Sequence, residues 1–515
     1  MSRNEIGVIV TLSASLVLYS IFFTLFFASP FGSLISTDSV YYLSAGKSFA
    51  VGNGFTAFNN EPITLWPPLF PFLIGTIAFI GLDPVAVIPT IQGFTLGATA
   101  ALGLFASYVF SRSWILSSLC GLLIVTAMPL IVLANRFLAE PIYIFLVSAV
   151  VIITISYLKR PDYKILLLLG GTCALAALQR YAGFSLIVAV CLCLLLYDHR
   201  PFIEKTKRMI VFGLVSCTPL AIWIIRNMII TGSLSGSRSF SIDLFVPALS
   251  SATQTFGGWF TPMLFGDPFT ILIGATMASS AVLIMLLSIW KRGNLIAIEV
   301  SVFAAFIVVG FVFAVYASFT ACCTDRFLAP LFPVVILFLA TLAVMIARRL
   351  ASYSEKGNRF IVGATIIVFC CVLGLQISRA SIYINDLFAD IHGFNTPAWT
   401  NKSIIQQIVK YPFEEDACIF SNDAPAVAYF LSRYCVKRGP RRARYYPASV
   451  RLDERDKVFA SIARINAKVY FIWFDGVSEE RFFPVSVLRD KFMVKSVYDT
   501  SDGTIYEITE RNPRN

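Results

Sequence analysis

Two acidic residues are the first candidates for chemistry, because acids are scarce in the apolar part of this sequence. Asp38 follows two residues that can cap a helix, Ser36 and Thr37, and so falls in a first helical turn. The exposed amides and dipole of a helix start keep such a carboxylate ionised and able to accept a proton. Glu140 directly precedes Pro141, a residue well suited to a helix start. Helix-end stabilisation or solvation at an interface would also explain each acid alone.

Four arginines at the ends of apolar segments are the second set of candidates: Arg136, Arg180, Arg226 and Arg326. A guanidinium group binds phosphate bidentately and stays charged at a partly dry site. Snorkelling, or a local ion pair such as Asp325 with Arg326, is the alternative explanation. Charges at membrane depth nevertheless indicate function by default, so we expect an anionic ligand near these residues.

The composition indicates that the bilayer is the solvent for most of this chain. Of 515 residues, 57% are hydrophobic and 14% are charged, whereas soluble proteins carry roughly 25% charged residues. The net charge of +11 lies in short clusters between apolar runs, which argues against nucleic-acid binding. With only two histidines in the chain, a histidine-based metal site is not expected.

Apolar runs predict about eleven membrane-spanning helices. The first, Ile6–Ala28, has no charge, and no cleavage site of a signal peptide follows it. The run Trp66–Gly81 is different, because after its prolines it allows a helix of only about 20 Å, short of a bilayer core of about 30 Å. We expect it to be interfacial or re-entrant. The predicted spans are 6–28, 85–110, 114–134, 141–157, 164–178, 183–197, 209–230, 269–290, 295–318, 326–346 and 360–378.

The basic residues set the predicted orientation. With the N-terminus inside, fifteen Lys and Arg residues lie in inside segments and six in outside segments up to residue 360. If 66–81 crossed the membrane, the bias would reverse, so the positive-inside rule favours a segment that does not cross. The first outer loop, 29–84, and the polar tail are then predicted to be extracytoplasmic. The chain divides into a membrane domain, 1–379, and a soluble domain, 380–515.

The tail shows strand and helix patterns of a small α/β or α+β domain. The expected elements are strands at Ala417–Ser421 and Lys468–Phe474, a helix at Ala424–Ser432 and a hairpin over Val494–Ile508 that turns at Ser501-Asp502-Gly503. The basic stretch Gly439–Tyr446 is read as a solvated loop in preference to a lipid-binding or glycan-binding patch.

Cys418 and Cys435 flank the expected helix in an oxidising compartment. Neighbouring strands could bring their Cα atoms within the roughly 4.4–6.8 Å that a disulfide needs. Two unpaired thiols are the equally weighted alternative.

The order of these features resembles the GT-C superfamily of membrane glycosyltransferases over roughly residues 1–380. It is most similar to bacterial relatives of the protein O-mannosyltransferases, the aminoarabinose–lipid A transferase and the rhizobial lipopolysaccharide galacturonosyltransferases. The matching pieces are Thr37–Tyr42, Trp66–Pro71, Leu138–Pro141, Gln179–Tyr181 and Asp325–Phe327 with Pro330 and Pro333. Leu65-Trp66 stands where the aminoarabinose transferase has Glu-Lys, and that lysine is expected to meet the donor phosphate, so this contact must come from elsewhere or is missing.

The resemblance implies an inverting transfer of sugar from a polyprenyl phosphate to a lipid, glycan or protein hydroxyl on the outer face of a bacterial inner membrane. Asp38 would be the base, and Glu140 would position the acceptor or, in an enzyme that uses one, a divalent cation. Arg180, Arg326 and Arg136 would neutralise the departing lipid phosphate. No nucleotide is needed, which fits the absence of phosphate-loop and dinucleotide-binding motifs.

Two other classes of protein remain as alternatives. A polytopic transporter or flippase would show inverted repeats and charges at the middle of its helices, and the sequence has neither feature. A membrane-anchored binding protein would depend on the tail, which has no recognisable motif, and ranks last.

Overall fold

The computed structural model describes residues 2–26, 31–236, 244–262, 266–290, 296–318, 324–351, 355–389, 393–432, 435–439, 448–477 and 482–510. The chain forms two compact units. The helical unit comprises residues 1–33, 64–70 and 85–388, and the mixed unit comprises 34–63, 71–84 and 389–515. The fold class predicted from the sequence is confirmed: an all-α membrane part accompanied by a small sheet-containing region.

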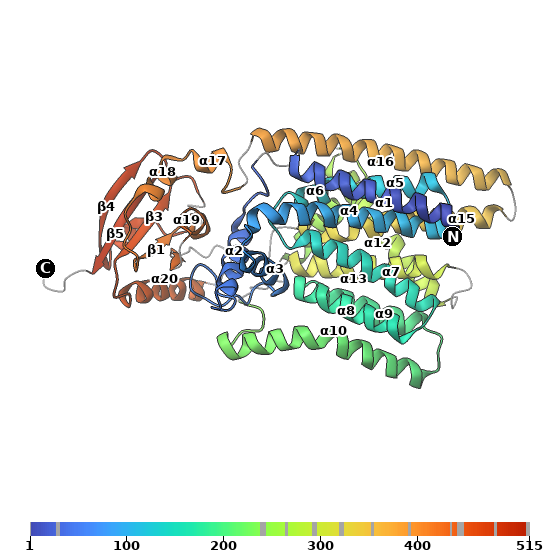
Figure 1. Cartoon of the computed structure of the whole chain (residues 1–515), viewed down its shortest axis with the longest axis horizontal. Coiled ribbons are helices and arrows are strands. Elements are labelled where there is room, and N and C mark those ends of the chain that lie inside the picture. The colour runs from blue at the N-terminus through green and yellow to red at the C-terminus, as the bar shows by residue number, and fades with distance from the viewer. Residues whose placement is uncertain are drawn as a thin grey trace. The chain divides into compact units, whose positions relative to one another are not determined.

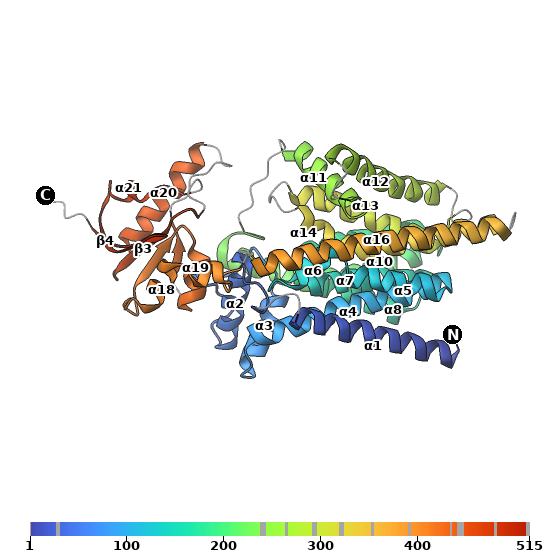
Figure 2. The same cartoon turned by 90° about the horizontal axis from the view of Figure 1, so that it is seen from above.

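The helical unit is built from helices that lie side by side (Figures 1 and 2). Their apolar composition and length suit a lipid environment, where a helix satisfies its own backbone hydrogen bonds. The helices are α1 (Arg3–Phe26), α4 (Pro84–Ser111), α5 (Trp114–Val125), α6 (Met128–Ala134), α7 (Glu140–Lys159), α8 (Tyr163–Gln179), α9 (Gly183–Tyr197), α10 (Phe202–Thr231), α11 (Phe245–Gly258), α12 (Asp267–Trp290), α13 (Ile298–Ser318), α14 (Thr324–Leu328), η2 (Ala329–Leu331), α15 (Phe332–Ala351) and α16 (Glu355–Ala389).

Every one of the eleven predicted spans coincides with helix in this unit. Within the described ranges, eight helical segments are long and apolar enough to cross a membrane, and the bent pair α5–α6 gives a ninth. The other two predicted spans match α8 and α9, which have 17 and 15 residues. The chain is therefore an integral membrane protein, while the number eleven stays a prediction.

The loop 29–84, which the sequence predicts to lie outside, contains two short helices, α2 (Thr37–Ala50) and α3 (Leu69–Phe79). With 11 residues, α3 is too short to span, as predicted. The two helices approach closely where Gly46 faces Gly75. A Cβ on Gly75 would lie only 2.7 Å from the carbonyl oxygen of Gly46, so a larger residue there would collide with the backbone of α2. The chain leaves α2 through Gly52 and Gly54, both at positive φ, at the stop predicted from the sequence.

In the mixed unit, most of the first outer loop joins the tail. Backbone hydrogen bonds link the two segments: Phe394 N donates to Ile35 O at 2.9 Å, and Val436 N donates to Phe58 O at 3.2 Å. The sequence analysis assigned the loop to the membrane domain, 1–379, together with the rest of the GT-C-like region. These long-range backbone pairs are not visible in local pattern, and they explain the different grouping.

A five-stranded sheet with the order β2-β1-β3-β5-β4 forms the centre of the mixed unit. β1, β2 and β3 are parallel, whereas β5 runs antiparallel to both β3 and β4. The crossovers through α19 and α20 run in opposite directions along the sheet, so their usual right-handedness puts these helices on opposite faces. The elements are α17 (Pro397–Thr400), α18 (Ser403–Lys410), β1 (Cys418–Ser421), α19 (Ala424–Leu431), β2 (Val436–Arg438), α20 (Ala448–Ala463), β3 (Val469–Phe474), α21 (Val485–Leu488), β4 (Phe492–Thr500) and β5 (Gly503–Glu510).

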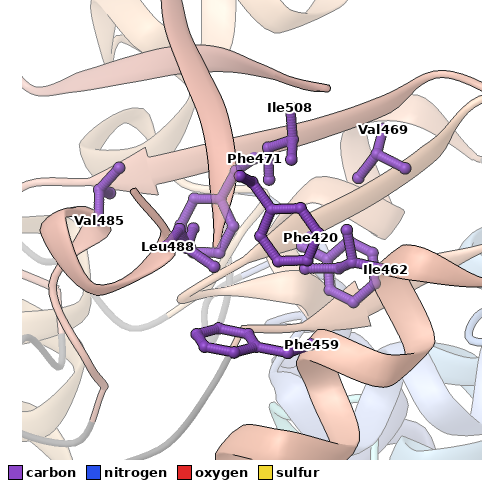
Figure 3. Close-up of a cluster of buried hydrophobic side chains, with 9 residues drawn as sticks. Phe420, Phe459, Ile462, Val469, Phe471, Val485, Leu488 and Ile508 are labelled. Carbon is purple, nitrogen blue, oxygen red and sulfur yellow. The ribbon is translucent and has the colours of Figure 1, made fainter. Parts of the chain in front are cut away.

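One face of this sheet holds an apolar core (Figure 3). Phe420 and Phe471 on neighbouring strands pack with Phe459 and Ile462 of α20 and with Leu488 of α21. The predicted strands, helix and hairpin of the tail are all present, and α17, α18, β2, α20 and α21 are additional. Of the predicted basic loop Gly439–Tyr446, all but Gly439 lies outside the described residues.

A disulfide joins Cys418 at the start of β1 to Cys435 just before β2, with Cα atoms 5.1 Å apart. The parallel pairing of Ile419 with Val436 brings the two cysteines together. The bridge that the sequence allowed is therefore present.

Candidate active site

The centre of the candidate site is Glu140, the first residue of α7, whose side chain is fully buried. Arg180, just after α8, and Arg326 in α14 both form ion pairs with the same carboxylate oxygen, Oε1. Three elements that are distant in sequence thus converge on one acid. The sequence predicted all three residues as candidates, and the structure brings them into direct contact.

Glutamine side chains hold the loop that leads to Glu140. Gln92 of α4 donates through Nε2 to the carbonyl oxygens of Arg136, at 2.6 Å, and Leu138, at 3.2 Å. Gln179 donates through Nε2 to the carbonyl oxygen of Ala139 at 2.9 Å. Both glutamine side chains are buried. Buried backbone oxygens need such partners, so these amides fix the loop and the start of α7.

The turn between α8 and α9 is equally constrained. Gly183 N donates to Arg180 O at 2.8 Å and closes the turn. A Cβ on Gly183 would collide with the backbone of Ala176 and Ala177, so only glycine allows α9 to fold back this closely on α8. Arg180 is thereby directed toward Glu140, with its guanidinium 5.7 Å from the centre of the Phe327 ring.

Tyr181, the next residue, anchors the same turn through its hydroxyl group. The hydroxyl donates to Thr64 O at 2.7 Å and accepts hydrogen bonds from Trp223 Nε1 at 3.0 Å and Asn227 Nδ2 at 3.2 Å. Arg226, between these two residues of α10, lies over the Trp223 ring at 4.5 Å and donates to Asn227 Oδ1. Arg226 thus supports the network around Tyr181.

The charges in this cluster do not cancel. Two guanidinium groups surround one carboxylate, which gives a net charge of +1. Glu140 Oε2 is also buried and has no hydrogen-bond partner among the described residues. Positive charge at low dielectric attracts an anion strongly, and a phosphate group matches the fork of a guanidinium.

Asp38 belongs to the mixed unit and lies in the first turn of α2, as predicted. A capping box spans it, in which Ser36 N donates to Ser39 Oγ at 2.9 Å. The chain entering α2 is fixed by Asn395, whose Oδ1 accepts a hydrogen bond from Ile35 N at 3.0 Å. Asp38 therefore lies on a helix whose start is held by the C-terminal part of the chain.

Two charged residues at the ends of sheet strands belong to the same unit as Asp38. The guanidinium of Arg438, at the end of β2, lies 5.7 Å from the centre of the Tyr41 ring, one turn after Asp38. Asp423 follows β1 and caps α19, accepting a hydrogen bond from Ala426 N at 3.2 Å. Burial raises the pKa of Asp423 to about 6, while that hydrogen bond and the charge of Arg438 act in the opposite direction.

Other predicted features are placed differently. The described ion pairs of Glu140 are with Arg180 and Arg326, whereas the guanidinium of Arg136 lies near the Tyr383 hydroxyl of α16. Asp325, offered as a partner for Arg326, accepts a hydrogen bond from Thr255 Oγ1 at 2.5 Å. Among the described residues there is no group of three or more His, Cys, Asp or Glu side chains that could hold a metal ion. A divalent cation therefore stays a prediction.

Sequence reasoning missed the residues that hold the cluster in place: Gln92, Trp223, Asn227 and Tyr383. Each is a polar or amphipathic side chain within an apolar run. Such a residue stands out from the surrounding composition, and this contrast could have marked it as a functional candidate. Gln179 and Tyr181 stood beside Arg180 in a quoted motif, but no role was assigned to them.

No protein family and no curated protein matches this chain. Among solved structures, the chain is similar to ArnT from Cupriavidus metallidurans in the apo state, with a TM-score of 0.50, 13% identity and coverage of 98% of both chains. A second structure of that protein, bound to undecaprenyl phosphate, aligns with a TM-score of 0.49, 12% identity and the same coverage. ArnT is an aminoarabinose–lipid A transferase of the GT-C class. The resemblance predicted from the sequence is thus confirmed for the fold, which is that of ArnT.

Proposed function

We propose that this chain is a membrane glycosyltransferase that takes a sugar from a polyprenyl-phosphate donor and transfers it to a hydroxyl group on the outer face of the membrane. The observation that carries this proposal is the pairing of Arg180 and Arg326 with the fully buried Glu140. It provides a fixed, net positive site at the ends of apolar helices, where a lipid phosphate would lie. The ArnT-like fold supports the same reaction class.

In the proposed reaction, the acceptor oxygen attacks the anomeric carbon of the donor sugar. The bond between that carbon and the phosphate oxygen breaks, and its electron pair leaves with the phosphate. The acceptor proton passes to the carboxylate of Asp38, the proposed base. A single displacement of this kind inverts the anomeric centre. General-base assistance is worth about 10²–10⁴-fold in rate.

The two arginines act on the leaving group. Negative charge on the phosphate grows as the bond breaks, and donors fixed in advance stabilise it without reorganising. Arg180 and Arg326 would supply the contact for which this sequence lacks a lysine, at Leu65-Trp66. Glu140 is then proposed to act mainly through them, because its buried carboxylate holds both guanidinium groups in place.

The experiment is a turnover assay with the full chain in nanodiscs. A panel of undecaprenyl-phosphate-linked sugars is incubated with extracted envelope lipids and glycans, and released undecaprenyl phosphate is quantified. Arg180→Gln and Arg326→Gln should each lower turnover about 10²-fold or more, the usual worth of such a group. Arg160→Gln is the matched control, because Arg160 is exposed at the opposite end of α7. Equal turnover by all three variants, or no release with any donor in wild type, would contradict the proposal.

A further inference from the structure

A second set of unsatisfied polar groups lies on the same loop as Glu140 but faces a different helix. Asn135, which ends α6, is 1% exposed, and both polar atoms of its side-chain amide are buried without a partner among the described residues. Arg136 Nε and the Tyr383 hydroxyl share that state. Buried polar groups are normally hydrogen-bonded, so several orphaned atoms together indicate a missing ligand or solvent.

The backbone arrangement brings the end of α6 and the Tyr383 region of α16 to the same level. Gln376 of α16 accepts a hydrogen bond from Met128 N, at the start of α6, at 3.0 Å, and donates to Trp259 O at 2.7 Å. Asn135 is seven residues beyond Met128, and Tyr383 is seven residues beyond Gln376. Both intervals are about 10 Å of helix. The guanidinium of Arg136 also lies near the Tyr383 hydroxyl, so α6 and α16 run in the same direction from the Gln376 contact.

Arg379, one turn before Tyr383, has partners for its two terminal nitrogens, while its Nε is buried without one among the described residues. It donates to the carbonyl oxygens of Gly258 and Thr261 and so caps the end of α11. Gln376 is occupied as well. Besides Arg379 Nε, the unsatisfied atoms near this contact of α6 with α16 belong to Asn135, Arg136 and Tyr383. These three offer an amide N–H, a guanidinium and a hydroxyl as donors and Asn135 Oδ1 as an acceptor.

We propose that Asn135, Arg136 and Tyr383 form a second anion-binding subsite that receives a phosphate or carboxylate group of an anionic sugar in the acceptor. The three donors match an oxyanion, and Asn135 Oδ1 can accept a hydrogen bond from a neighbouring sugar hydroxyl. Arg136 is four residues before Glu140, a distance of at most about 14 Å along an extended chain. Donor phosphate and acceptor anion could thus bind on two sides of one loop. The assignment of this anion to the acceptor substrate rests on the proposed function.

The test uses the full chain in phosphatidylcholine nanodiscs and three probes: undecaprenyl phosphate, glucose 1-phosphate and glucose. Binding of glucose 1-phosphate is measured by calorimetry with and without saturating undecaprenyl phosphate. Wild type should bind glucose 1-phosphate in both conditions and should not bind glucose. Arg136→Gln should weaken glucose 1-phosphate binding about tenfold or more, as expected for losing a charge-assisted bond. Tyr383→Phe should weaken it less, and Arg136→Lys should retain part of it. Arg180→Gln should instead weaken undecaprenyl phosphate binding.

Three results would overturn the subsite. The first is that Arg136→Gln reduces undecaprenyl phosphate affinity as much as Arg180→Gln does, which would show that both arginines belong to one donor-binding site. Glucose 1-phosphate binding could be unchanged in Arg136→Gln and Tyr383→Phe. Adding phosphatidylglycerol to the nanodisc could abolish glucose 1-phosphate binding, which would assign the residues to a phospholipid headgroup. Failure of undecaprenyl phosphate to bind wild type would count against the proposed function alone, because the glucose 1-phosphate measurement does not require it.

Discussion

Arg180 and Arg326 contact the same oxygen of Glu140, although one residue follows α8 and the other lies in α14. A carboxylate that is shared in this way is a structural requirement as well as a chemical one. Removing it would leave two guanidinium groups close together at a mostly buried position without the carboxylate that they share.

Glu140→Ala is therefore expected to lower the free energy of unfolding by about 3–5 kcal/mol, the usual effect of breaking a buried ion pair from one side. Glu140→Gln keeps the shape and one acceptor oxygen, so it should be less destabilising and should reduce turnover by a smaller but measurable factor. Unfolding of the purified protein in mixed micelles gives the first quantity. Wild-type stability in Glu140→Ala would show that the arginines do not depend on this carboxylate.

The turn that carries Arg180 offers a matched pair of glycines. Gly183→Ala would place a Cβ against the backbone of Ala176, whereas Gly171→Ala in α8 meets open space. We expect Gly183→Ala to cost about 1–3 kcal/mol, as overpacking usually does, and to lower turnover because Arg180 moves. Gly171→Ala should change neither quantity. Thermal unfolding and donor turnover of both variants check this, and equal behaviour of the two would contradict the close approach.

The sequence predicted some residues of this site but not the contacts between them. Glu140, Arg180 and Arg326 were identifiable because charge at the end of an apolar run is expensive and therefore noticeable. Their convergence on one oxygen could not be identified from the sequence, since the contact joins residues from three separate parts of the chain and depends on how the helices pack. Tyr383 shows the same limit, because only the lateral contact of α6 with α16 gives it a neighbour in Arg136.

The fold was predictable for a related reason. Spans such as α7 and α13 follow directly from apolar length, and the hairpin of β4 and β5 follows from alternation around a tight turn. The grouping of residues 34–63 with the tail does not follow from the sequence, because hydrogen bonds such as that from Ile35 N to Asn395 leave no local pattern. β2 is only three residues long, too short for alternation to reveal it.

The disulfide between Cys418 and Cys435 should contribute measurably to the mixed unit. The cysteines are 17 residues apart in the sequence, and a closed loop of that size is worth about 3 kcal/mol. Cys418→Ser combined with Cys435→Ser should speed hydrogen exchange in β1, α19 and β2 of the full chain. Cys370→Ser, an exposed free cysteine in α16, is the control. Unchanged exchange in the double variant would show that the bridge adds nothing to folding.

Asp423 predicts a pH dependence of the same region. Burial raises its folded pKa to about 6, above the unfolded value of about 3.9. The folded state therefore binds the proton more tightly, and the stability that this gives is lost as the pH rises from about 4 through about 6. Asp423→Asn keeps a good helix cap and should remove this loss. Hydrogen exchange of α19 measured between pH 4 and pH 7 checks it, with intrinsic exchange rates corrected for pH. An equal slope in the variant would contradict the prediction.

The central claim is tested most directly by Asp38→Asn. The asparagine preserves the shape of the side chain and its place in the first turn of α2, so folding should barely change, but it removes the charge that accepts the proton. Turnover of an undecaprenyl-phosphate-linked sugar by the purified variant, measured as initial rate alongside wild type, should fall by at least about two orders of magnitude. Binding of undecaprenyl phosphate should persist, because Arg180 and Arg326 are intact. Transfer at a rate near that of wild type would contradict the assignment of Asp38 as the base.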